Sequence, residues 1–127
     1  QLTKLEAKEF SPEVGSTGSG NWKVAFPFKR SKNEEALKLK EALEKSIKDL
    51  KYKNVVSKDI YTFEDQFVIV HGFESKDRAL GYSELLQKNK DYRIKNPRFV
   101  ILSSNYKIVQ VHKNLADYKN SVLTPKP

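Results

Sequence analysis

The 127-residue chain is long enough for one folded domain, and its 38% hydrophobic and 31% charged residues are ordinary for a globular protein. It contains no cysteine, which excludes disulfides, thiol nucleophiles and Cys-based zinc sites, and no apolar run reaches the roughly 18 residues of a membrane-spanning helix. The formal net charge of +8 favours anionic partners such as nucleic acid, anionic lipid or acidic protein, although a need for solubility also explains it.

The N-terminal residues 1–21 have the composition of a flexible tail or linker. Ser16–Gly20 contains only Ser, Thr and Gly, which offer no apolar face to bury. The chain begins with Gln1 and shows no signal peptide, so we expect a processed chain or an excised domain whose targeting segment has been removed. We predict one folded domain over residues 22–120 and a second tail over residues 121–127.

The first predicted elements are a strand and a helix. Trp22–Phe28 alternates in hydrophobicity, which predicts a strand. Pro27 cannot donate a ladder hydrogen bond, so we expect it at the end of that strand or on an edge of the sheet. Ser31 and Glu34 have capping-box spacing and predict a helix that continues to about Leu50. The predicted helix carries apolar residues at three- and four-residue intervals: Ala36, Leu39, Leu43, Ile47 and Leu50.

A second strand, hairpin partner and helix follow in the middle of the chain. Val55–Phe63 is rich in β-formers, and Gln66–Val70 is a continuous apolar run typical of a buried strand. Ser75 is a candidate N-cap for a helix over Lys76–Gln87. A basic polar loop over 89–97 then leads to a fourth strand at Phe99–Leu102.

The C-terminal segment fits two structures. The β-branched residues of Ile108–Val111 favour a strand that forms a hairpin with the fourth strand. Ser103-Ser104-Asn105 is also a good helix start, and Leu115, Ala116 and Tyr118 suggest a short helix capped by Asn114. We expect two short helical pieces over residues 104–120.

The order of these elements, β-α-β-β-α-β, predicts an α+β fold. It is the split-βαβ order of a ferredoxin-like sandwich, with an antiparallel sheet and an extra C-terminal short helix or strand. The two main helices can bury their apolar stripes only if both lie on one face of the sheet. The opposite face is then open to solvent, a ligand or another domain.

The sequence supplies no catalytic constellation, so we expect no enzyme activity and no cofactor. His71 follows a strand, but the neighbouring Glu74, Ser75 and Asp77 are ordinary helix-start residues rather than an orienting acid and a nucleophile. A metal site would need His71 and His112 to meet beside a carboxylate, which nothing in the sequence indicates, so we predict no metal. Phosphate-binding glycine loops are absent from the sequence.

RNA-recognition motifs share the predicted strand and helix order. They stack bases on aromatic residues of the first and third strands, on the open face of the sheet. The third strand here, within 65–73, lacks the Lys/Arg-Gly-aromatic signature that those strands carry. Nucleic acid is therefore an unlikely partner by this pattern.

Residues 66–118 resemble a known family. Phe67–Phe73, followed by Ala79-Leu80-Gly81-Tyr82, is similar to the strand and Ala-x-x-Tyr helix of the C-terminal domain of the tetratricopeptide-repeat lipoprotein of the Bacteroidetes type IX secretion and gliding machinery. Phe99–Tyr106 and Lys113–Tyr118 are similar to the closing part of that domain, which tends to be helical. The resemblance implies a non-catalytic, protein-binding scaffold domain in the periplasm, tethered to the outer membrane through the full-length protein.

A second resemblance leads to an alternative function. Phe67–Phe73 with Ser75 and Ala79 also looks like a segment of the sporulation-related repeat domain, which has a similar fold and binds peptidoglycan glycan strands. If this resemblance holds, the open sheet face is the glycan platform. Aromatic and amide side chains expected there are candidate sugar-binding residues, namely Trp22, Tyr61 and Gln66.

Overall fold

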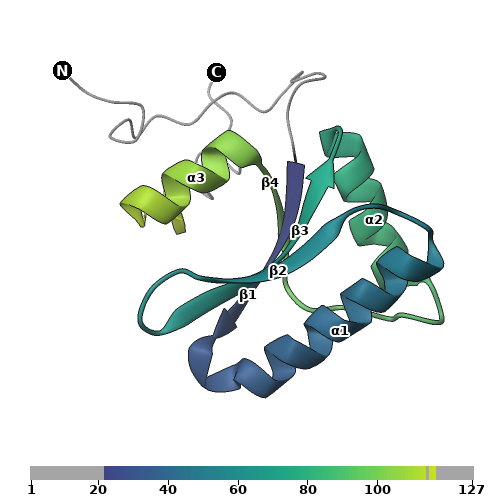
Figure 1. Ribbon diagram of the computed structural model, residues 1–127, viewed down its shortest axis with the longest axis horizontal. Coiled ribbons are helices and arrows are strands. Elements are labelled where there is room, and N and C mark those ends of the chain that lie inside the picture. The colour runs from purple at the N-terminus through teal and green to yellow at the C-terminus, as the bar shows by residue number, and fades with distance from the viewer. Residues whose placement is uncertain (1–21, 114, 117–127) are drawn as a thin grey trace.

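The computed structural model describes residues 22–113 and 115–116 (Figure 1). The predicted tails at 1–21 and 121–127, and the predicted final helix residues Asn114 and Tyr118, lie outside this part of the chain. The elements are β1 (Trp22–Lys29), the 3-10 turn η1 (Arg30–Lys32), α1 (Asn33–Asp49), β2 (Val55–Ile60), β3 (Asp65–Phe73), α2 (Lys76–Lys88), β4 (Phe99–Leu102) and α3 (Ser103–His112).

The four strands form one sheet in the order β2-β3-β1-β4, and each neighbouring pair is antiparallel. β3 therefore lies between β1 and β2, which run parallel and are joined through α1. β1 lies in the same way between β3 and β4, which are joined through α2. The predicted α+β class and the β-α-β-β-α-β order are confirmed, with α3 added at the end.

Both α1 and α2 cover one face of the sheet, as predicted. The apolar stripe of α1 packs on alternate residues of β1 and β3, because side chains two residues apart share a face of a strand. Leu43 and Phe26 are completely buried in this layer, and burial of each such side chain stabilises the fold by about 1.5–3 kcal/mol. The core of this layer contains Trp22, Val24, Phe26, Ala36, Leu39, Leu43, Ile47, Val68, Val70, Phe73, Ala79, Tyr82 and Leu86.

The two helix starts differ from each other. The Ser75 hydroxyl accepts a 3.1 Å hydrogen bond from the Arg78 backbone N–H, which confirms the predicted N-cap of α2. The predicted capping box at Ser31 and Glu34 is wrong, because Ser31 already lies in the turn η1 and the N-cap position belongs to Lys32, which makes no side-chain cap.

The opposite face of the sheet is not open, because α3 covers it (Figure 1). Tyr106 and Val109 of α3 are buried against Phe67 and Ile69 of β3 and Ile101 of β4. The strand alternative for 108–111 is therefore wrong. These residues form a helix despite their β-propensity, because Tyr106 and Val109 are three residues apart and a helix therefore places both on the sheet.

β2 is shorter than predicted and ends at Ile60. The backbone N–H groups of Tyr61 and Thr62 both donate to the Asp65 carbonyl oxygen, at 2.9 and 3.0 Å. These bonds close a turn that contains Phe63, so the last predicted strand residues leave the ladder.

Candidate functional site

The three predicted sugar-binding residues do not form an exposed platform. Trp22 and Gln66 are buried on the face that α1 and α2 cover, so their predicted position on the opposite face is wrong. Strand alternation explains this, because Trp22 shares a face with Val24, and Gln66 shares one with Val68. The Gln66 amide also donates to the Lys29 carbonyl oxygen at 3.3 Å.

Tyr61 lies on the predicted face but beneath the C-terminal segment. Its ring is buried against Phe67, with 5.0 Å between ring centroids, and its hydroxyl accepts a 3.1 Å hydrogen bond from the Leu115 backbone N–H. The face on which glycan strands, or the bases of an RNA, would have stacked is thus closed by α3 and Leu115.

Below α3, a polar network joins β1, β2 and β3. The Nζ atom of Lys23 lies 2.7 Å from His71 Nδ1, and the Ser57 hydroxyl lies 2.6 Å from His71 Nε2. Ser57 also donates to Asp59 Oδ1 at 3.0 Å. The sequence reasoning missed this grouping, because Lys23, Ser57 and His71 come from three separate strands.

α3 completes the network through Tyr106 and Gln110. The Tyr106 hydroxyl donates to Asp59 Oδ2 at 2.6 Å, and the Gln110 amide donates to the Tyr106 oxygen at 2.8 Å. Burial and the hydrogen bond to Asp59 raise the pKa of Tyr106 well above its ordinary value, so the phenol stays protonated as a donor.

The cationic and imidazole groups of the network are also perturbed. Burial lowers the pKa of His71 first, and the neighbouring Lys23 ammonium lowers it further, while Asp59 raises it. Burial lowers the pKa of Lys23, and Asp59 opposes that effect. His71 is therefore held neutral at a pH where an exposed histidine begins to protonate.

Hydrogen-bond directions show that the network does not activate Ser57. A carboxylate only accepts, so the Ser57 hydroxyl proton points to Asp59 and His71 Nε2 must donate to Ser57. His71 Nδ1 in turn accepts from the Lys23 ammonium. No lone pair of His71 is left to take a proton from Ser57, and the network acts in this geometry as a polar connection between the sheet and α3.

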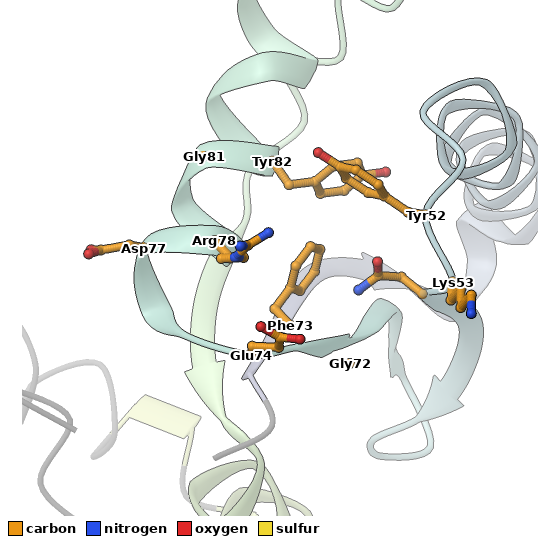
Figure 2. Close-up of a pocket in the computed structure, with 10 residues that line it drawn as sticks. Tyr52, Lys53, Gly72, Phe73, Glu74, Asp77, Arg78, Gly81 and Tyr82 are labelled. Carbon is orange, nitrogen blue, oxygen red and sulfur yellow. The ribbon is translucent and has the colours of Figure 1, made fainter. Parts of the chain in front are cut away.

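A groove lies where β3 ends, between the segment before β2 and the first half of α2 (Figure 2). Its volume is about 530 Å³, within the usual range for ligand pockets. The rings of Tyr52 and Tyr82 lie next to each other above Phe73, with centroid distances of 6.3 Å for Tyr52–Tyr82 and 5.3 Å for Phe73–Tyr82. Lys53, Asn54, Gly72, Glu74, Asp77, Arg78 and Gly81 complete the lining.

Two glycines, Gly72 and Gly81, lie in the lining of this groove. A Cβ atom at Gly81 would have no neighbouring atom within 4 Å, so the absence of a side chain there leaves free space above the helix. Gly72 adopts a φ of +88°, which L-residues rarely adopt, where β3 ends beside Asn54. In Figure 2 the Arg78 side chain points toward the groove and that of Asp77 points away from it.

The edge strand β2 and its flanks expose unusually many large apolar side chains. Of the seven large hydrophobic side chains exposed in the described ranges, four belong to the segment 52–63: Tyr52 at 44%, Val55 at 63%, Ile60 at 61% and Phe63 at 88%. A sequence signal for this edge existed, because Val55 and Ile60 are five residues apart. Two strand residues at an odd spacing face opposite sides of the sheet, so both cannot lie in one core layer.

Within the described part of the chain, no three His, Asp or Glu side chains converge as metal ligands. None of the helices described is both long and apolar enough to cross a membrane. Comparison of the chain with protein-family models, with curated proteins and with solved structures found no match in any of the three.

Proposed function

We propose that this chain is a non-catalytic protein-binding scaffold domain, and that its partner binds along the β2 edge of the sheet. The observation that carries this proposal is the set of exposed apolar side chains along the β2 edge, at Tyr52, Val55, Ile60 and Phe63, of which Val55 and Ile60 face opposite sides of the sheet. An outer strand with exposed apolar side chains on both faces suits a partner segment that extends the sheet, because the added strand then meets an apolar neighbour on each face.

The position of β2 supports the same proposal. β2 is the outermost strand on its side of the sheet in the part of the chain that the structure describes, and its alternate residues Val56, Lys58 and Ile60 direct their backbone groups away from β3. Of these groups, the Ile60 carbonyl oxygen already accepts a 3.3 Å hydrogen bond from the Gln110 amide. An extended segment can add to such an edge as a new strand, with main-chain hydrogen bonds for affinity and side-chain contacts for specificity. The face of the sheet, in contrast, is closed by helices on both sides.

The proposal includes a place in the bacterial cell envelope, within a machinery for protein secretion. Its support is the resemblance of Phe67–Phe73, Ala79–Tyr82 and Phe99–Tyr106 to the type IX secretion lipoprotein domain. The full-length gene provides the test. A lipoprotein signal and helical repeats upstream, with the native protein in the outer-membrane fraction, are expected, and a cytosolic native protein would contradict this location.

Selection of displayed peptides against the 127-residue chain tests the binding edge. We expect the selection to yield peptides in which apolar and polar residues alternate. Titration with these peptides should shift the amide NMR signals of residues 55–60 and 66–71. Ile60→Lys should weaken binding about tenfold or more, since it replaces an apolar contact with a charge. Leu37→Lys, at an exposed site on α1, is the matched control and should leave binding unchanged.

Two results would overturn this assignment. Peptides whose NMR shifts map away from β2 would contradict the edge as the binding surface. Retention on purified peptidoglycan sacculi that is lost in Tyr52→Ala would instead support glycan binding, with Tyr52 as the exposed ring for sugar stacking.

A further inference from the structure

We propose that the groove between Tyr52 and α2 receives one apolar side chain of the partner segment, and that an acidic residue beside that side chain contacts Lys53 and Arg78. This inference rests on the proposed function, because it assigns the chemistry of the segment that binds at the β2 edge. It identifies the partner as an extended, acidic peptide with a single apolar anchor.

The aromatic base of the groove selects an apolar anchor. Phe73 and Tyr82 are buried, and the Tyr82 hydroxyl is already bound to Ser46 Oγ at 2.6 Å. Burial raises the pKa of Tyr82 to about 12, so no charge arises at the base. Phe73 at 4% and Tyr82 at 2% exposure close the base, so the ring surface that the groove offers to a ligand is chiefly that of Tyr52, which is 44% exposed and which an aliphatic or aromatic side chain covers favourably.

The groove is continuous with the β2 edge. Tyr52 and Asn54, which line it, also line a second hollow of about 440 Å³ together with Val55, Val56 and Ile47. A segment that pairs with β2 and continues past Val55 therefore reaches Asn54 and then the groove. On the α2 side of the groove, a Cβ atom at Gly81 would meet no atom within 4 Å.

Charge around the groove favours an acidic segment. The nearby acids of α1 are occupied, because Glu44 pairs with Lys40 at 3.0 Å and Asp49 pairs with Lys45 at 2.8 Å. The groove is lined by two cations, Lys53 and Arg78, and by two acids, Glu74 and Asp77, and none of the four has an ion pair among the residues described. The Asp77 side chain points away from the groove, and Lys48 of the second hollow adds a further cation, so positive charge exceeds negative charge at the groove.

Of these cations, Arg78 is the best placed for a carboxylate. Its side chain points toward the groove, and no acceptor for its guanidinium occurs in the part of the chain that the structure describes. A guanidinium can hold a carboxylate through two parallel hydrogen bonds, which a lysine cannot do. Lys53, on the opposite side of the groove, adds a second positive charge.

Three labelled synthetic peptides test the inference with the full chain. They share one alternating Thr-Val host sequence and differ only at its centre, which is Leu-Asp, Ala-Asp or Leu-Lys. We expect the Leu-Asp peptide to bind about tenfold or more tightly than either of the others in fluorescence anisotropy, since it alone supplies both the anchor and the charge.

Two variants of one position show whether the groove is responsible. Gly81→Leu fills the groove and should remove the preference for Leu over Ala. Gly81→Ala is the matched control and should retain it, because one methyl group occupies little of the free space. Trp22 fluorescence checks that both variants are folded, since Trp22 is the single tryptophan of the chain and lies in the core. Arg78→Glu should remove the preference for Asp over Lys.

The outcomes separate this inference from the proposed function. Equal binding of all three peptides, with NMR shifts on β2, would overturn the groove assignment and leave the edge assignment intact. Binding of none of them, together with no peptide from the displayed library, would overturn both. Tight binding of a single-stranded RNA at physiological salt that displaces the Leu-Asp peptide would identify the partner as nucleic acid and overturn the inference.

Discussion

Tyr106 and Asp59 are joined by a 2.6 Å hydrogen bond that connects α3 to the edge strand β2. The two residues are 47 positions apart in the chain, and this contact is the point at which the final helix is attached to the polar network of the sheet. The same Asp59 carboxylate accepts from Ser57, so the edge strand and the helix share one acceptor.

Tyr106→Phe should destabilise the fold. The substitution removes one charge-assisted hydrogen bond from a buried phenol and leaves Asp59 with Ser57, which is expected to cost about 1.5–3 kcal/mol of unfolding free energy. Urea denaturation followed by Trp22 fluorescence measures the loss. Tyr92→Phe, which removes an exposed contact to Asp49, is the control and should cost clearly less; equal losses would contradict a special role for the Tyr106 contact.

Stability should depend on the protonation of His71. Its pKa in the folded chain is below the ordinary value of 6.5, mainly because of burial, so the unfolded chain binds the proton first. His71 therefore contributes stability above pH 6.5, and this contribution is lost as the pH falls through the lower folded pKa. We expect the unfolding free energy to decrease from about pH 7 to about pH 5.

The pH dependence has a direct control. His71→Gln removes the titrating ring, and its unfolding free energy should change less over that range. Urea denaturation at several pH values provides the data. An unchanged slope in His71→Gln would show that another group is responsible.

The two glycines of the groove should respond in opposite ways to alanine. Gly81→Ala should raise the unfolding free energy by about 0.5–1 kcal/mol, because alanine is the better helix former and its Cβ meets no neighbour. Gly72→Ala should lower it by about 1–2 kcal/mol, since an L-residue is strained at a φ of +88°. Thermal unfolding distinguishes the two, and a stabilising Gly72→Ala would contradict the backbone conformation at that position.

Ser46 and Tyr82 should be energetically coupled. Their hydroxyl groups are 2.6 Å apart in the core, and the Ser46 hydroxyl donates to the Leu43 carbonyl oxygen at 2.7 Å, so the Tyr82 hydroxyl is the donor to Ser46. Ser46→Ala should cost about 1–3 kcal/mol, because the buried Tyr82 hydroxyl loses this partner. A double-mutant cycle with Tyr82→Phe should give a coupling of about 0.5 kcal/mol or more, and strict additivity would contradict the contact.

Strong periodic signals made most of the fold predictable. The apolar stripe of α1 from Ala36 to Ile47 is buried most favourably against a sheet. The apolar run at Val68–Val70 fits a strand within that sheet, with Val68 and Val70 under the helix. The helix over 103–112 was harder, because its β-branched residues favour a strand locally. Only the packing of Tyr106 and Val109 on the sheet decides for a helix, and that packing is not visible in local sequence.

The candidate site could not be predicted in the same way. Trp22 and Gln66 were placed on the wrong face although alternation ties Trp22 to Val24 and Gln66 to Val68, because which face of each strand α1 and α2 cover is decided by tertiary packing. The groove at Tyr52 depends on where a loop, a strand end and a helix meet, and on two glycines that contribute by lacking side chains. Such a site has no sequence motif.

The two edges of the sheet are unequal. β2 offers six residues, whereas β4 at the other edge has four and is followed directly by α3. A second partner strand would have to pair with β4, which is shorter than β2. If a partner strand joins β2 as we propose, we expect one such addition per domain rather than repeated growth of the sheet, since β4 is the shorter edge in the described part of the chain.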